Sequence, residues 1–308
     1  MASSAIPTID VSPYFRSDEE NEEGKKKAME QIIDACVSYG FFQIANHGIP
    51  LDSLSTTMDM YKTFFASSDE EKSSLPEPNY IKSTQKSAGT YEHLWFRLSS
   101  FSAFTNNPPQ FRHVLEEMAS HFTKLGVLLE RIISECLGLP PDFLGNYKND
   151  RSRDSMMGLH YFPAKEDDNT GKPAHEDPGF FSILYQDEVG GLQVQKDGHW
   201  IPIAPSKDKL VVNIGDVIQV LSNNKFKSAT HRVVRPTETH RYSCAFFYNL
   251  QGDKWVEPLP QFTTEIGESP EYRGFHFDEY LQLRLRNRSH PPARPEDFIH
   301  ITHYSISC

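Results

Sequence analysis

The sequence predicts an α+β fold that is rich in β-structure, with helices first and a sandwich or small barrel of strands after them. Before residue 140, long segments repeat apolar residues at helical spacing, whereas many short β-branched or aromatic runs separated by Gly, Pro, Asn and Asp follow residue 155. The 308 residues suit one large β-barrel domain or two ordinary domains. Because 38% of the residues are hydrophobic, the chain can form a substantial core, which excludes disorder as its main state.

The first half of the chain is predicted to be mainly helical. Its elements are expected, in order, as a strand at 6–10, a helix at 25–39 that ends at Gly40, a buried strand at 41–45, a second helix at 51–67, and loops with short strands at 70–108. The clearest helix spans 114–137, where Met118, Phe122, Leu125 and Leu129 lie on one apolar stripe. Gly138 and the two prolines after it stop this helix.

The second half of the chain is predicted to consist of short strands and one final helix. The strands are expected at 158–163, 180–185, 191–194, 200–203, 209–214, 217–221, 229–234 and 241–250, and the helix at 280–288. Many short strands at regular spacing favour a sandwich or a small barrel.

Composition excludes several classes of function. The net charge of −11 and the absence of a long basic run disfavour nucleic acid as a partner. No apolar run is long enough to span a membrane, and the N-terminus lacks the pattern of a secretory signal. The 4 cysteines are scattered without a Cys-x-x-Cys pair, which is typical of free thiols in a reducing compartment. We therefore expect a cytoplasmic protein whose partner is a small molecule, and the sequence leaves open whether it also has protein partners.

The strongest candidate for a catalytic centre is the group His175, Asp177 and His231. His175 and Asp177 are two residues apart, so on an extended strand their side chains share a face. His231 opens another strand-like run. Two imidazoles and one carboxylate on neighbouring strands would occupy one side of a metal and leave three positions open, as in non-haem Fe(II) oxygenases. We predict that these three residues are both metal ligands and catalytic residues.

A second group, Arg241 and Ser243, follows the same period of two along a later strand. A guanidinium inside an apolar strand is costly without a partner, so an anionic ligand is expected beside it. The fork of Arg donors and the Ser hydroxyl together suit a carboxylate. Phe247 lies further along the same face and suits a wall for an organic substrate.

Simpler interpretations apply to each motif taken alone. The chain has 13 His, and His276-Phe277-Asp278 repeats the His-x-Asp pattern. No Arg-x-Ser follows that second copy, so we interpret it as a solvated feature or the start of a helix. For the first copy, the β context, the shared face and the later Arg-x-Ser together favour a metal centre. Sequence patterns of dinucleotide-binding proteins, P-loop proteins, zincins and serine hydrolases are absent.

Together these motifs resemble the plant-type 2-oxoglutarate- and Fe(II)-dependent dioxygenases, over about residues 6 to 300. The N-terminal match consists of IPTID at 6–10 and GFFQIANHGI at 40–49. The catalytic match is the order H-x-D, H, R-x-S, with 54 residues from the Asp to the second His and 10 more to the Arg. GGLQV at 190–194 and NIGD at 213–216 are similar to core strands of the family. The compact members that act on auxin or on specialised metabolites are the most similar.

The resemblance implies a double-stranded β-helix, or jelly roll, flanked by N-terminal and C-terminal helices. It implies Fe(II) bound by His175, Asp177 and His231, with 2-oxoglutarate and O2 as cosubstrates. The distal carboxylate of 2-oxoglutarate would bind Arg241 and Ser243. The expected regions are an N-terminal region at 1–105, a support helix and linker at 106–150, the catalytic core at 151–252, and a C-terminal helix and lid at 253–308.

One segment departs from the family pattern. Many relatives have Asn-Tyr-Tyr-Pro where this chain has His160-Tyr161-Phe162-Pro163. In those relatives the Asn and the second Tyr help to hold 2-oxoglutarate. Phe162 has no hydroxyl, so that hydrogen bond is expected to be missing, and His160 either replaces the Asn or only packs. His160 and Tyr161 are retained as candidate cosubstrate contacts.

The expected reaction is oxidation, in the first place hydroxylation, of a small, largely apolar plant metabolite such as an alkaloid, a steroid-type or a phenolic compound, with release of succinate and CO2. Phe247, Phe180 and Tyr91 are candidate substrate contacts, with the loop from Tyr91 to Phe101 and the C-terminal helix as further walls. The presence of Asp177 disfavours halogenation, because related halogenases lack that ligand.

Three alternatives stay open. The first is oxidation of auxin, indole-3-acetic acid, which would need a second cationic group in the pocket; Arg97 and Lys82 are candidates. The second is an Fe(II) oxidase of similar sequence that does not use 2-oxoglutarate, because such relatives share Arg241 and Ser243. The third is a ligand-binding relative without catalytic activity.

Overall fold

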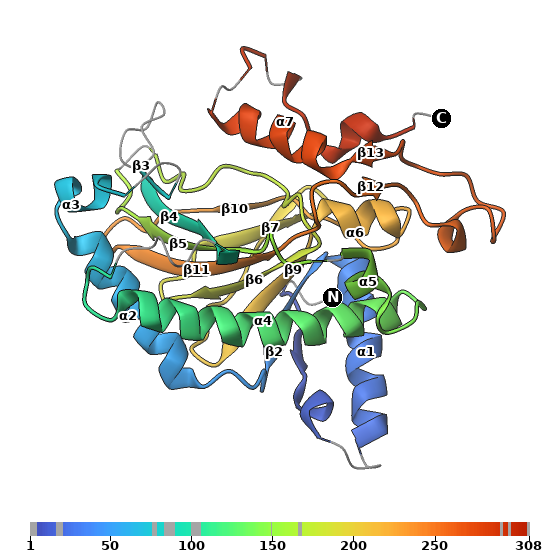
Figure 1. The fold of residues 1–308 in the computed structure, drawn as a ribbon, viewed down its shortest axis with the longest axis horizontal. Coiled ribbons are helices and arrows are strands. Elements are labelled where there is room, and N and C mark those ends of the chain that lie inside the picture. The colour runs from blue at the N-terminus through green and yellow to red at the C-terminus, as the bar shows by residue number, and fades with distance from the viewer. Residues whose placement is uncertain are drawn as a thin grey trace.

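The computed structural model describes residues 5–16, 21–75, 79–82, 90–99, 106–148, 150–165, 168–289, 292–294 and 297–306, without the side chains of 288 and 289. Within these residues, none of the helices has the length and apolar character needed to cross a membrane. Strands dominate the centre of the molecule, and helices lie on its outside (Figure 1).

The helices are α1 (Asn21–Ser38), α2 (Leu51–Ala66), α3 (Asp69–Ser73), α4 (Phe111–Cys136), α5 (Phe143–Lys148), α6 (Asp216–Leu221) and α7 (Phe277–Ser289). The strands are β1 (Thr8–Asp10), β2 (Phe41–Ala45), β3 (Tyr80–Lys82), β4 (Tyr91–Arg97), β5 (Ser155–Tyr161), β6 (Phe181–Gln186), β7 (Leu192–Lys196), β8 (His199–Pro202), β9 (Lys209–Ile214), β10 (His231–Val233), β11 (Arg241–Tyr248), β12 (Trp255–Val256) and β13 (Phe275–His276).

Two sheets form the centre of the protein. The larger sheet has the strand order β1-β2-β9-β6-β11-β5-β4-β3, and the smaller has the order β10-β7-β8. Apart from the parallel pair β1 and β2, the neighbouring strands are antiparallel. The two sheets face each other, because side chains from both line one pocket. This arrangement is the double-stranded β-helix, flanked by helices, that the family resemblance implies.

The longest helix, α4, supports the outer face of the larger sheet. Figure 1 shows it running along the strands, with α2 beside it. Met118, Phe122, Leu125 and Leu129 are buried on its inner stripe, as predicted. At Gly126 the helix comes so close to β11 that an added Cβ would lie 2.8 Å from the ring of Tyr248. Burial of this stripe fixes the position of β11, which carries part of the site.

Most of the predicted elements are present, but one is of the wrong type. Residues 217–221, predicted as a strand, belong to helix α6. All six residues of α6 are buried, so the segment shows neither helical nor strand periodicity, and a short apolar run does not distinguish the two. The region 70–108 also contains the short helix α3, which was not predicted, in addition to β3 and β4.

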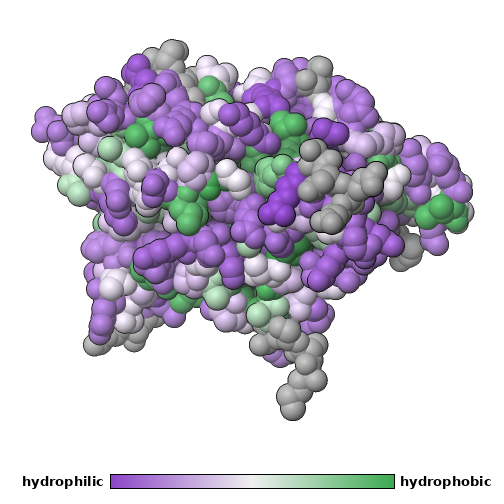
Figure 2. Space-filling view, turned by 90° about the horizontal axis from the view of Figure 1, so that it is seen from below, coloured by the Kyte–Doolittle hydropathy of each residue, from purple (hydrophilic) through white to green (hydrophobic). Residues whose placement is uncertain are grey.

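The surface seen from below is largely hydrophilic. Figure 2 shows the hydrophobic side chains of this face in separate small groups among hydrophilic ones. Scattered apolar residues of this kind are ordinary for a globular protein. Most of the residues that the sequence predicts to be functional lie inside the molecule, between the sheets.

Candidate metal and cosubstrate site

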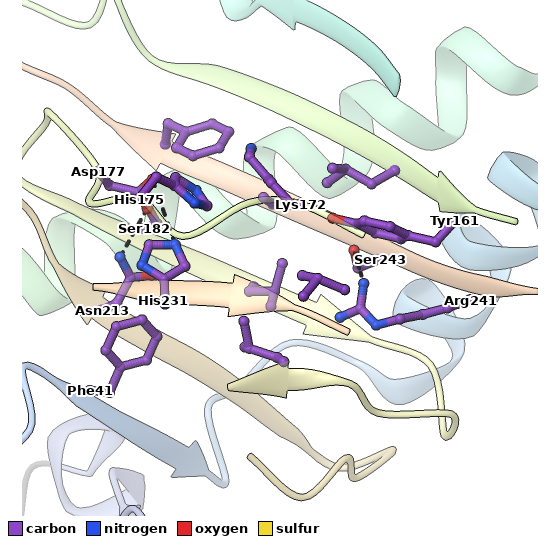
Figure 3. Close-up of a pocket in the computed structure, with 16 residues that line it drawn as sticks. Phe41, Tyr161, Lys172, His175, Asp177, Ser182, Asn213, His231, Arg241 and Ser243 are labelled. Atoms are coloured by element: carbon purple, nitrogen blue, oxygen red, sulfur yellow. Dashed lines mark hydrogen bonds and ion pairs between the residues drawn. The ribbon is translucent and has the colours of Figure 1, made fainter. Parts of the chain in front are cut away.

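A pocket between the two sheets brings together both motifs that the sequence predicts. His175, Asp177 and His231 lie at one end of the pocket, and Arg241 and Ser243 lie toward the other (Figure 3). Arg241, Ser243, Ala245 and Phe247 of β11 all line this pocket, so the predicted period of two holds along that strand.

The backbone positions the three candidate ligands by pairing two segments far apart in the sequence. His175 lies between β5 and β6 and forms an isolated antiparallel bridge with His231 of β10. The two amides and carbonyls exchange hydrogen bonds of 3.0 and 2.9 Å. The carbonyl of Asp177 accepts a hydrogen bond of 2.8 Å from the amide of Asp216, at the start of α6. The predicted strand containing His175 and Asp177 is therefore a single bridge followed by an irregular turn.

Backbone carbonyls set the tautomer of both imidazoles. Nδ1 of His175 lies 2.8 Å from the carbonyl oxygen of Pro173, and Nδ1 of His231 lies 3.1 Å from that of Ala229. A carbonyl can only accept, so each Nδ1 carries the proton and each Nε2 presents a lone pair. The two Nε2 atoms lie 3.8 and 3.9 Å from Oδ1 of Asp177.

Asp177 is presented with one oxygen toward the imidazoles and the other held by neighbours. Its Oδ2 accepts hydrogen bonds of 2.6 Å from the Ser182 hydroxyl and 2.9 Å from the Asn213 amide. Burial alone would raise the pKa of this carboxyl, but His231, His175 and these two hydrogen bonds together hold its pKa below the usual value. Asp177 is therefore an anion at neutral pH, whereas burial lowers the pKa of His231 and favours its neutral form.

This donor set fits a divalent first-row metal. One ligand atom from each of the three residues lies within 4.8 Å of the others, and within the described residues no other group of at least three His, Cys, Asp or Glu side chains meets that condition. Two neutral imidazoles and one carboxylate on one side of an ion are the ligand type of non-haem Fe(II) oxygenases. The second His-x-Asp copy is different, because His276 is exposed and Asp278 pairs with Arg153 at 2.7 Å.

Arg241 is fully buried and is held in a fixed orientation. It donates to the carbonyl of Gly190, to the Ser243 hydroxyl at 3.1 Å and to the Gln186 side-chain oxygen at 3.0 Å. These acceptors are all neutral, and burial lowers the pKa of the guanidinium. A buried cation with neutral hydrogen-bond partners favours an anionic ligand, as the sequence predicts.

The period of two places the two candidate contacts His160 and Tyr161 on opposite faces of β5. Tyr161 lines the pocket, with the centre of its ring 4.9 Å from Cζ of Arg241. His160 points to the other face of β5, where Nδ1 lies 2.8 Å from Glu92 and Nε2 lies 2.8 Å from His240. The structure thus does not bring His160 to the cosubstrate end. The phenol that was expected to be missing at position 162 is supplied to the pocket by Tyr161.

The three predicted substrate contacts occupy different places. Phe247 lines the pocket. Phe180 does not; it is fully buried in the larger core, with its ring 6.5 Å from that of Tyr147. Tyr91 packs against Tyr161 at a ring distance of 5.6 Å, behind the pocket wall. Phe101 lies outside the described residues.

The sequence did not predict several residues that line the pocket, among them Phe41, Lys172, Ser182 and Asn213. Ser182 and Asn213 orient Asp177, and the ring of Phe41 in β2 packs edge-on against His231 at 5.2 Å. Lys172, three residues before His175, lines the wall between the metal end and Tyr161 (Figure 3). Asn213 lies in the NIGD segment, which was predicted only to be a core strand. For the others, nothing in the local sequence indicates that they face the pocket.

Comparison with known proteins gives the same interpretation over most of the chain. The profile of the 2OG-Fe(II) oxygenase superfamily matches residues 153–250, and a profile described as the N-terminal part of non-haem dioxygenase in morphine synthesis matches residues 6–95. The flavonol synthase/flavanone 3-hydroxylase of Arabidopsis thaliana is 32% identical over 300 residues, which cover 91% of this chain and 86% of that protein.

Solved structures agree with the sequence comparison. JOX2 in complex with 2OG, Fe and JA superimposes with a TM-score of 0.80 at 30% identity, covering 96% of this chain and 89% of JOX2. AtDAO1, the dioxygenase for auxin oxidation 1 from Arabidopsis thaliana, in a complex with 2-oxoglutarate, gives a TM-score of 0.71 at 26% identity, covering 84% of this chain and 97% of AtDAO1. The pocket, the matched profiles and these relatives together show that this chain belongs to the 2-oxoglutarate- and Fe(II)-dependent oxygenases, and that it is an oxidoreductase that uses Fe(II) and 2-oxoglutarate.

Proposed function

We propose that this enzyme hydroxylates a small, largely apolar plant metabolite, such as an alkaloid, a steroid-type or a phenolic compound, and releases succinate and CO2. The observation that carries the proposal is the convergence of His175 Nε2, Asp177 Oδ1 and His231 Nε2 in a pocket that also contains a buried arginine. When bound, Fe(II) supplies the chemistry that couples reduction of O2 to decarboxylation of 2-oxoglutarate and oxidation of a C–H bond.

At the metal end, the protein fixes the ligands before the metal binds. The carbonyls of Pro173 and Ala229 hold the protons on Nδ1 of the two imidazoles, so neither Nε2 has to lose a proton. Ser182 and Asn213 hold one oxygen of Asp177 and leave the other toward the imidazoles. These three side chains would bind one side of the ion and would leave the opposite side for the cosubstrates.

At the other end, Arg241, Ser243 and Tyr161 form the binding site for the distal carboxylate of 2-oxoglutarate. The guanidinium offers donors in a fixed plane, and the two hydroxyls can donate beside it. Because Arg241 is fully buried, its attraction for a carboxylate is stronger than it would be in water.

The apolar part of the pocket supports an apolar substrate. Side chains from both sheets form this wall: Leu184, Leu192, Val233, Ala245 and Phe247. Burial of a hydrocarbon surface against them is favourable by about 25 cal/mol per Å² of apolar area removed from water. The relative named flavonol synthase/flavanone 3-hydroxylase supports a phenolic substrate.

Oxidation of auxin is the second candidate. It is supported by the likeness to AtDAO1. It is also supported by Lys172 in the pocket wall, because an auxin-type acid needs a second cationic group in the pocket.

Turnover of 2-oxoglutarate tests the proposed function. Protein reconstituted with Fe(II) should convert 2-oxoglutarate to succinate and CO2 in the presence of O2, slowly alone and faster when a metabolite extract contains the substrate. An Asp177→Ala variant of normal fold should form no succinate above the level of free iron. Equal succinate formation by both proteins would contradict the proposal, and substrate oxidation without succinate would indicate the oxidase that does not use 2-oxoglutarate.

A further inference from the structure

We propose that Lys172 binds a carboxylate of the organic substrate, so that the substrate is a small organic acid with an apolar body. The proposal rests on the proposed function and names the class of molecule that the same site accepts. It starts from one observation: Lys172 is a cation in the wall of the pocket, close to the reacting end.

An irregular backbone turns Lys172 toward the pocket. The amide of Gly171 donates to the carbonyl of Val233 at 2.9 Å, while the amide of Val233 donates to the carbonyl of Lys172 at 3.0 Å. Two residues on one segment thus oppose one residue of β10, which is the pattern of a β-bulge. The next contact pairs His175 with His231, so the five residues 171–175 oppose the three residues 231–233.

The bulge explains why both Lys172 and His175 face the pocket. Residues three apart on a regular strand point to opposite faces. Here Pro173 and Ala174, which are exposed, take up the additional length, and the side chains before and after them line the same pocket. In Figure 3, Lys172 lies between His175 and Tyr161, which is between the metal end and the cosubstrate end.

Lys172 places a second positively charged side chain in the pocket, in addition to Arg241. Among the described residues that line it, Asp177 is the carboxylate, and Arg241 is a cation. Lys172 adds a positive charge to the wall of a half-buried site, where an ion pair is screened less than on the surface. A substrate carboxylate is the group that this charge would stabilise.

The rest of the pocket wall is largely apolar and favours a substrate with an apolar body. The apolar side chains Leu192, Val233 and Phe247 share the pocket with Lys172. The two cationic side chains that the sequence offered as candidates, Lys82 and Arg97, do not line the pocket. Lys82 is exposed and pairs with Asp69 at 2.7 Å, and Arg97 lies 5.7 Å from the ring of Trp95, outside the pocket lining.

Binding of matched acids and amides tests the proposal. The protein, loaded with Fe(II) and 2-oxoglutarate without O2, is titrated with pairs such as indole-3-acetate and indole-3-acetamide, phenylacetate and phenylacetamide, and cinnamate and cinnamamide, while the visible charge-transfer band is followed. We expect at least one acid to bind about tenfold or more tightly than its amide, as a charged hydrogen bond allows. Lys172→Met should abolish this preference, and Lys172→Arg should retain it.

Matched controls separate this role from others. Lys207→Met removes an exposed lysine that pairs with Glu188 and should leave the preference unchanged. The dissociation constant of 2-oxoglutarate should stay within twofold in Lys172→Met, and a tenfold rise would assign Lys172 to the cosubstrate and overturn the proposal. Absence of any acid preference in the wild type, or its persistence in Lys172→Met, would also overturn it. In those cases a normal charge-transfer band leaves the proposed function intact, whereas failure of the band in the wild type refutes the proposed function and this proposal with it.

Discussion

At the metal end of the pocket, two side chains that are not ligands determine how Asp177 is presented. Ser182 and Asn213 both donate to Oδ2, which leaves Oδ1 toward the imidazoles. Residues that orient a ligand in this way commonly change metal affinity by about 10- to 100-fold when they are removed. Metal affinity therefore depends on these two side chains as well as on the three ligands.

We predict that Ser182→Ala weakens metal binding about tenfold, because Asp177 loses one of the two donors that orient it. Asp177→Ala should abolish binding. Titration calorimetry with Mn(II) as a redox-stable probe measures both. The exposed Ser55→Ala on α2 is the control and should bind like the wild type. Wild-type affinity in Ser182→Ala would contradict the assigned role.

The cosubstrate end gives a prediction that distinguishes neighbouring residues. Tyr161→Phe should raise the dissociation constant of 2-oxoglutarate about tenfold, because one hydroxyl donor to a carboxylate is lost. Phe162→Tyr should leave it unchanged, because Phe162 lies on the other face, with its ring 4.5 Å from that of His160. Anaerobic titration with 2-oxoglutarate measures both variants. Tighter binding by Phe162→Tyr would show that the phenol acts from position 162.

Sequence reasoning located the residues whose spacing is itself the signal. His175, Asp177 and His231, and later Arg241 and Ser243, follow from strand periodicity and from their order along the chain. His160 and Tyr161 were both candidate contacts by analogy with the family, and only Tyr161 lines the pocket. The position of Lys172 depends on a bulge that no local pattern indicates.

At the scale of elements, α5 is joined to the start of β5 by a buried ion pair. Nζ of Lys148 lies 2.6 and 2.7 Å from the two oxygens of Asp154, and 3.3 Å from the centre of the Tyr248 ring. Burial outweighs the pairing and lowers the pKa of Lys148 from 10.5 to about 8, while it raises the pKa of Asp154. The charged pair therefore orients α5 at a cost in desolvation.

This pair predicts a stability that rises with pH in the alkaline range. The folded protein holds the Lys148 proton less tightly than the unfolded chain, so the contribution to stability increases as pH rises from about 8 toward 10.5. Relative to Lys148→Met, the free energy of unfolding of the wild type should increase between pH 7.5 and 9.5. Urea denaturation of both proteins at each pH measures the difference. A difference that is constant or that shrinks with pH would contradict this account.

Long periodic elements were predictable, and short apolar ones were not. The stripe of α4 spans seven turns, so its burial was evident from the sequence. Helix α6 has six buried residues, and its type is decided by the hydrogen bonds of its N-terminus to the metal segment, where Val217 donates to Gly179 at 3.1 Å. Such tertiary contacts are not visible in a local pattern.

At the scale of the whole molecule, the C-terminal helix α7 is tied to the metal segment. Arg284 donates to the carbonyl of Glu176 at 2.6 Å and to Asp216 at 3.2 Å, and the Tyr280 hydroxyl donates to Asp216 at 2.6 Å. His300 lies 3.0 Å from the Glu176 carboxylate. Figure 1 shows α7 on the opposite side of the strands from α4. The C-terminal region therefore supports the residue between His175 and Asp177.

We predict that Arg284→Met lowers the free energy of unfolding by about 3 to 5 kcal/mol, because Asp216 is then left as a buried charge without its cation. Asp216→Asn in the same protein should recover part of this loss, and urea denaturation of the two single variants and the double variant measures the coupling. Additive effects of the two substitutions would show that the pair does not act as a unit.

The most direct test of the whole account is an anaerobic titration of the metal-free protein with Fe(II) and then with 2-oxoglutarate. The account predicts one ferrous ion per chain and a visible charge-transfer band that forms only when both are present, because the cosubstrate needs the positions that His175, Asp177 and His231 leave open. The band should be absent from Asp177→Ala. An iron-loaded wild type without the band, or an unchanged band in that variant, would contradict the central claim.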